Sequence, residues 1–122
     1  MISLLDLARR IDAGDLTPAA ALAWTRERIA AREGDIGAFV ELDEDAGALD
    51  QGPLRGIATG VKDIIDAAGL PTRMGSPVYA DWRPLADAPV VSALRRAGST
   101  IVGKTTTTAF AFLHPTDTRT PH

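Results

Sequence analysis

The sequence predicts an α/β fold, because two strand-like stretches flank a helix-like one and two further helical stretches precede them. Residues 57–62 alternate apolar with small side chains, and residues 100–104 contain a β-branched run, as strands do. Between them, apolar residues at positions 90, 91, 94 and 97 follow helical spacing and end at Gly98. This order predicts a right-handed βαβ unit whose two strands run parallel.

Two amphipathic helices are predicted ahead of this unit, giving a helical lead-in over about residues 1–35. In the first, apolar residues at positions 4, 7, 8 and 11 share one face, and the pattern ends near Gly14. In the second, we expect Thr17 to cap the helix, Pro18 to occupy its first turn and Gly34 to end it.

Residues 37–42 are predicted to form a short strand, and residues 43–52 either an exposed helix turn or a linker. The βαβ part covers about residues 52–105. The long connection after Lys62 mixes glycine and proline with aromatic residues, and long ordered loops are often functional. Asp87 is expected to cap the crossover helix, with Pro89 in its first turn. No boundary divides the chain, so residues 1–122 are predicted to belong to one domain.

Composition and charge exclude several classes of function. The 122 residues carry a formal net charge of −3 without a long basic cluster, so we expect no nucleic acid or membrane partner. The absence of cysteine excludes a thiol nucleophile, and His114 and His122 lack a spaced partner, so neither a metal nor a cofactor is expected. Without a signal peptide or an apolar run of membrane-spanning length, the protein is expected to be cytoplasmic.

Residues 98–105 match the G-x-x-x-x-G-K-T pattern of a phosphate-binding loop. That loop needs a strand before its first glycine and a helix after its lysine, so that backbone N–H groups can surround a phosphate. Here a predicted helix precedes Gly98, and the β-branched run forms a strand inside the supposed loop. We therefore predict no nucleotide binding and interpret Lys104 as a strand-end lysine.

Lys62 is the residue that the strand pattern itself suggests for a functional role. It ends the first strand of the βαβ unit and is followed by Ile64 and Ile65, so it could be desolvated, which disfavours the charged amine. A neutral amine at this position could accept a proton. The simpler interpretation, which the residues alone favour, is a lysine whose side chain reaches solvent from the strand end. Asp63 should point to the opposite side of the strand.

The sequence resembles the amidase signature family of serine amidohydrolases. The motifs that carry the resemblance are Gly-Pro-Leu-Arg-Gly-Ile at 52–57, Val-Lys-Asp at 61–63, Asp-Ala-Pro-Val-Val at 87–91, residues 94–105 and Phe-Ala-Phe at 110–112. Residues 1–4, 37–40, 62–66, 74–76 and 105–108 are similar to the malonamidase subgroup of bacteria. The resemblance implies a mixed β-sheet core covered by α-helices, of which this chain would supply the N-terminal helices and the first βαβ unit.

The resemblance also implies a Ser-cisSer-Lys triad in which Lys62 is the lysine. The neutral lysine would take a proton from a bridging serine, which in turn deprotonates the nucleophilic serine. The implied substrate is a small carboxylated amide such as malonamate, cleaved to the acid and ammonia without a cofactor, and the implied assembly is a homodimer. The serine-rich signature is absent from the 122 residues, and Ser76, Ser92 and Ser99 do not lie in such a motif. We therefore expect these residues alone to be inactive.

A second hypothesis is a non-catalytic module, or one half of a split enzyme, that binds a partner. A parallel strand pair normally needs further strands and helices to cover it. We therefore expect the isolated chain to be weakly folded or to associate through its exposed sheet edge.

Overall fold

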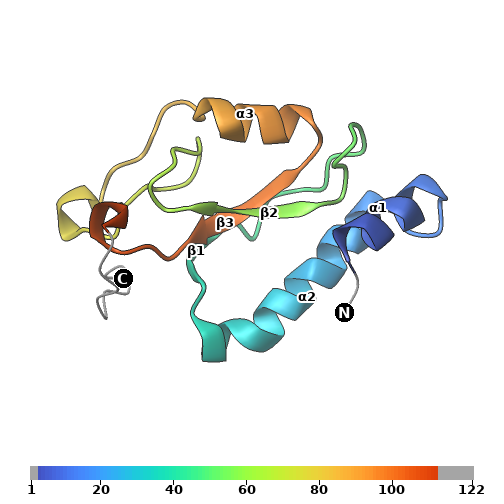
Figure 1. The fold of residues 1–122 in the computed structure, drawn as a ribbon, viewed down its shortest axis with the longest axis horizontal. Helices are drawn as coiled ribbons and strands as arrows, with labels where there is room; N and C mark the ends of the chain where they lie inside the picture. The colour runs from blue at the N-terminus through green and yellow to red at the C-terminus, as the bar shows by residue number, and fades with distance from the viewer. Residues whose placement is uncertain (1–2, 113–122) are drawn as a thin grey trace.

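A computed structural model describes residues 3–112 of the chain (Figure 1). The regular elements are α1 (Leu4–Asp12), α2 (Pro18–Ile36), β1 (Phe39–Leu42), β2 (Ala58–Lys62), α3 (Pro89–Arg96) and β3 (Thr100–Thr105), with short 3-10 turns η1 (Pro77–Tyr79) and η2 (Ala109–Ala111). Residues 43–52 contain no helix and form the predicted linker. Among residues 3–112, no helix combines the length and apolar character needed to cross a membrane.

The three strands form one mixed sheet in the order β1-β3-β2. β2 and β3 are parallel, with Val61 beside Lys104 and Lys62 beside Thr105, which confirms the predicted βαβ unit. β1 pairs antiparallel with the other side of β3, a position that its sequence did not reveal. Within the described part of the chain, β3 is therefore the central strand and β2 lies at an edge.

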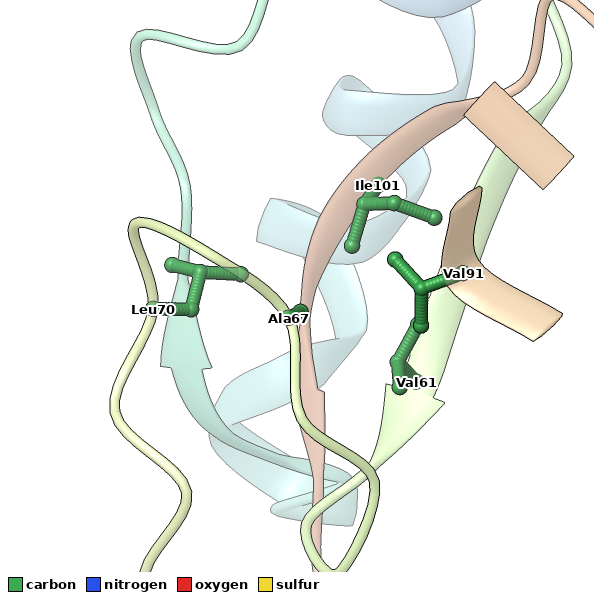
Figure 2. Close-up of a cluster of buried hydrophobic side chains, with 5 residues drawn as sticks. All are labelled: Val61, Ala67, Leu70, Val91 and Ile101. Atoms are coloured by element: carbon green, nitrogen blue, oxygen red, sulfur yellow. The ribbon is translucent and has the colours of Figure 1, made fainter. Parts of the chain in front are cut away.

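The helices lie on both sides of the sheet, with α3 on one side and α1 and α2 on the other (Figure 1). Beneath α3, five buried residues from β2, the connection after it, α3 and β3 make one apolar cluster (Figure 2): Val61, Ala67, Leu70, Val91 and Ile101. A second cluster joins the two N-terminal helices to the start of β2 through Leu7, Ile11, Ala21 and Ile57. Both clusters therefore fix β2, one at each end.

Two predicted helix boundaries are wrong. α2 continues through Gly34 and ends at Ile36. Gly37, with a positive φ of 60° and an N–H bond to the carbonyl of Glu33, forms the C-terminal cap. Asp87 does not cap α3: the N-cap residue is Ala88, which has no capping side chain. The Asp87 carboxylate instead accepts from the N–H of Ala68 at 2.7 Å and pairs with Arg95 at 3.1 Å. A local glycine cap therefore determines the end of α2, and the contacts of Asp87 with Ala68 and Arg95 determine that it is not the cap of α3.

Candidate active site

Lys62 is the last residue of β2, at the carboxyl end of the parallel strand pair. The chain turns immediately after it, because its carbonyl accepts the N–H groups of Ile64 at 2.8 Å and Ile65 at 2.9 Å. Crevices at the carboxyl ends of parallel strands are where α/β sheets bind ligands. The position of Lys62 is therefore suited to chemistry, and the turn after it fixes its backbone.

The side chain of Lys62 is exposed, contrary to the burial that we considered from the sequence. Side chains alternate along a strand, so the buried neighbours Val61 and Asp63 take the inner face and leave Lys62 on the other. In addition, β2 is an edge strand of the described sheet, and no other described strand continues beyond it. Residues 3–112 by themselves therefore do not desolvate this amine.

Asp63, next to Lys62, is fully buried and makes polar contacts in three directions. Its N–H donates to the carbonyl of Thr105 at 3.1 Å, and its own carbonyl accepts from the N–H of Met74 at 2.8 Å. Its carboxylate accepts from the N–H of Arg73 at 3.2 and 3.3 Å and pairs with Lys104 at 3.1 Å. The predicted opposite orientation of Lys62 and Asp63 agrees with the exposure of one and the burial of the other.

Lys104 is fully buried on the central strand and has three oxygen partners. Its Nζ donates to the carbonyl of Pro71 at 3.1 Å, to Oγ1 of Thr72 at 2.6 Å and approaches Oδ1 of Asp63 at 3.1 Å. An ammonium has three N–H donors, so all of them are used. Burial lowers the pKa of Lys104, while the hydrogen bond and charge of Asp63 oppose that change. Lys104 lies near the end of β3, as predicted, and its side chain is an interior ion-pair residue.

The geometry required by a phosphate-binding loop is missing from residues 98–105. β3 runs from Thr100 to Thr105, through the middle of the pattern, and Gly98 follows α3 where a strand would be needed. The amine that would meet a phosphate is held by Asp63, Pro71 and Thr72. The predicted strand inside the motif is confirmed.

The connection after Lys62 packs along the end of the sheet. The guanidinium of Arg73 pairs with Glu41 on β1 at 2.9 Å and donates to the carbonyl of Val40 at 3.3 Å. Beyond it, a side chain on Gly75 would come within 2.8 Å of the carbonyl oxygen of Thr108, so glycine is required by the close approach. The N–H of Phe110 donates to the carbonyl of Met74 at 2.8 Å. Residues 71–76 are thus held between β1, the end of β2 and the segment after β3.

The serines of the described chain have structural contacts of their own. Ser76 caps η1, and Ser3 caps α1. Ser99 is buried, donates to the carbonyl of Ile57 at 3.0 Å and lies 2.7 Å from the hydroxyl of Thr59. Ser92 lies within α3. Ser99 is therefore an interior residue whose hydroxyl takes part in structural hydrogen bonds. His114 and His122, which we did not expect to bind metal, lie outside the described residues.

The family model for amidases matches residues 30–120 of the sequence. The chain belongs to the amidase family. Among curated relatives, a glutamyl-tRNA(Gln) amidotransferase subunit of Salinibacter ruber is 36% identical over 136 aligned positions, covering 96% of this chain and 26% of that protein. The corresponding protein of Salinispora tropica is 38% identical over 99 positions, covering 70% of this chain and 20% of that protein. The chain thus spans about a quarter of the length of these amidase relatives.

Solved structures of amidases contain the same arrangement of elements. The peptide amidase of Stenotrophomonas maltophilia superposes with a TM-score of 0.80 at 33% identity, covering 95% of this chain and 27% of that one. The glutamyl-tRNA(Gln) amidotransferase subunit of Thermotoga maritima gives a TM-score of 0.71 at 26% identity over 76% of this chain and 21% of that one. The predicted fold, an N-terminal α/β portion of the amidase signature fold, is confirmed. These relatives are not specifically malonamidases.

Proposed function

We propose that this chain supplies the lysine of an amide-hydrolysing site and that Lys62 is that lysine. Three observations support the assignment: membership of the amidase family, the match of Val61-Lys62-Asp63 to the family's lysine motif, and the place of Lys62 at the carboxyl end of a parallel strand. The assignment depends above all on one observation: the amine of Lys62 is exposed, while its backbone is fixed by the buried neighbours Val61 and Asp63. The other lysine of the sequence is already fully engaged.

In the proposed reaction, neutral Lys62 takes a proton from a bridging serine, which deprotonates the nucleophilic serine as it attacks the amide carbonyl. The proton returns from Lys62 through the bridging serine to the leaving nitrogen, so that ammonia departs, and water then hydrolyses the acyl-enzyme to the acid. Both serines would come from polypeptide outside these 122 residues, either later in the same protein or in a partner. That polypeptide would also cover the β2 edge, and the resulting desolvation would favour the neutral amine. Residues 3–112 alone would therefore be inactive.

We propose a small carboxylated amide, similar to malonamate, as the substrate and a homodimer as the assembly. Support comes from the motifs at residues 37–40, 62–66 and 74–76, which are similar to malonamidases. The relative named as a peptide amidase offers a second amide class, a peptide amide. Glutamine, which carries a free primary carboxamide, is a third compound for comparison. Rates of ammonia release from these three compounds therefore distinguish the three candidate substrate classes.

The test is ammonia release by the intact protein, meaning the natural polypeptide that carries these 122 residues, with malonamate, a C-terminal peptide amide and glutamine. We expect turnover with malonamate and a loss of roughly 10³-fold or more in Lys62→Met, as removal of a triad member produces. Lys62→Arg should be equally inactive, because a guanidinium stays protonated and cannot accept the proton. Arg32→Met, which removes an exposed cation on α2, is the matched control and should retain full activity.

Two outcomes would overturn parts of this proposal. Full activity of Lys62→Arg would remove Lys62 from the proton relay altogether. Turnover of a peptide amide or glutamine in preference to malonamate would leave the lysine assignment intact and replace the substrate. An intact mass of 12.8 kDa would direct the search for the serines to a separate chain.

A further inference from the structure

We propose that the buried Asp63–Lys104 pair is a positioning device for Lys62, which clamps the carboxyl end of β2 to the central strand and to residues 71–74. The inference rests on the proposed function, because it concerns how the amine of Lys62 is held. It assigns a role to two residues that would not contact the substrate.

The first step is the location of the pair relative to Lys62. Asp63 follows Lys62 directly and is bonded to two other segments. On β3, its N–H donates to the carbonyl of Thr105 and its carboxylate pairs with Lys104. In the connection, its carbonyl and its carboxylate accept from the N–H groups of Met74 and Arg73. Lys62 cannot change its backbone direction without breaking at least one of these bonds. Rigid backbone at this point limits where the flexible side chain of Lys62 can reach.

The second step is the set of contacts by which Lys104 connects β3 to the end of β2 and to the connection after it. From β3, its ammonium reaches across to Asp63 and to two residues of the connection, Pro71 and Thr72. Residues 71–74 are attached to β1 in turn through Arg73. A single buried amine on β3 therefore joins the end of β2 to residues 71–72.

The third step is charge. An isolated carboxylate beside Lys62 would stabilise the protonated amine and oppose its use as a base. Lys104 compensates that carboxylate, so Asp63 can fix the backbone without this effect. The other charged groups around the pair are Asp66, which accepts from the indole of Trp82, and Arg73, which is paired with Glu41. Neither of them replaces Lys104 as the direct partner of Asp63.

The experiment compares three variants of the intact protein: Lys104→Met, the double variant Asp63→Asn/Lys104→Met, and Arg55→Met as control. Arg55→Met removes an ion pair, Arg55–Asp12 at 2.6 Å, that joins the segment before β2 to α1. Asn at position 63 retains an acceptor for the N–H of Arg73, so the double variant removes the charges without leaving that donor unpaired. The readouts are kcat, KM and the lower limb of the activity–pH profile.

We expect kcat of the double variant to fall by about 10- to 100-fold with KM changed less than about twofold, because the reacting amine is misplaced and substrate binding is not. In Lys104→Met the lower limb should also move to higher pH, since the carboxylate of Asp63 is then uncompensated; in the double variant the limb should stay in place. Arg55→Met should leave all three quantities unchanged.

The inference is overturned by a folded double variant with wild-type kcat, or by a folded Lys104→Met whose pH limb does not move. If Lys104→Met does not fold, the double variant decides. The failure of the proposed function is distinguishable, because it would appear as activity in Lys62→Arg, a variant that leaves the pair intact.

Discussion

Lys62 and Lys104 are the two lysines of the sequence, and they lie near the carboxyl ends of neighbouring parallel strands. Lys62 is on the edge strand, where its side chain is exposed; Lys104 is on the central strand, where 0% of its surface is exposed. The difference follows from strand order, because a central strand has covered faces and neighbours on both sides. The amine of Lys62 is thus available for a reaction, while that of Lys104 is held by a buried ion pair and hydrogen bonds.

The largest expected effect is on stability. Lys104→Met should lower the free energy of unfolding by about 3–5 kcal/mol, because it leaves Asp63 as an uncompensated buried charge. Lys62→Met should lower that free energy distinctly less, because within residues 3–112 its side chain is exposed and not part of a buried ion pair. Urea denaturation of the intact protein measures both values. Equal losses in the two variants would contradict the contrast between the lysines.

A smaller difference in unfolding free energy is expected between alanine variants at two paired glycines, Gly60 on β2 and Gly103 on β3. A side chain on Gly103 would meet the carbonyl oxygen of Glu41 at 2.3 Å, and this backbone cannot move without separating β1. At Gly60 the nearest atoms belong to the side chains of Thr105 and Phe39, which can rotate. Gly103→Ala should therefore cost about 1–3 kcal/mol of unfolding free energy, and Gly60→Ala distinctly less.

Thermal or urea unfolding of Gly60→Ala and Gly103→Ala under the same conditions measures this difference in unfolding free energy. If Gly60→Ala were the more damaging change, the edge strand would be as tightly confined as the central one, and the assignment of β2 as the adaptable edge would be wrong.

The smallest expected effect is a pH dependence due to Lys104. Burial holds the pKa of Lys104 below its ordinary value of 10.5, so the folded protein releases this proton at lower pH than the unfolded chain does. Between the two pKa values the unfolded state binds more protons, and the free energy of unfolding therefore rises with pH. No such rise occurs below the lowered pKa, where both states are protonated.

Unfolding free energies measured across the alkaline range, up to about pH 11, should show that rise in the natural sequence and in Lys62→Met. Lys104→Met should show a smaller rise, because the contribution of Lys104 is then absent. Identical alkaline slopes in all three proteins would contradict the assignment.

The sequence predicted the βαβ unit and the position of Lys62 because both depend on local patterns. Alternating and β-branched residues identify β2 and β3, and Gly98 marks the end of the helix between them. The burial of Lys104 was not predicted, because a lysine at the end of a pattern such as Ile101-Val102-Gly103 is expected to reach solvent. Only the antiparallel pairing of β1 with β3, a contact between distant segments, makes its strand central.

The same reason explains the misassigned residues. Aspartate is a common helix cap, but the carboxylate of Asp87 pairs with Arg95 at the other end of α3 and accepts from the N–H of Ala68, which is distant in the sequence. Asp63 could be assigned to the side of β2 opposite Lys62 by alternation alone, yet its partners lie about 10 and 40 residues away along the chain. Local periodicity identifies a face, and only the assembled fold identifies what that face contacts.

The central claim, that one lysine is available and the other is locked, is tested most directly by labelling the intact protein with an amine-reactive reagent and mapping the modified peptides by mass spectrometry. We expect rapid modification of Lys62 and none of Lys104 until the protein is denatured, because Lys104 reacts only through opening of the fold. If a serine-bearing region covers β2, Lys62 should become protected by a substrate analogue. Modification of Lys104 at a rate equal to that of Lys62 in the native protein would contradict the account.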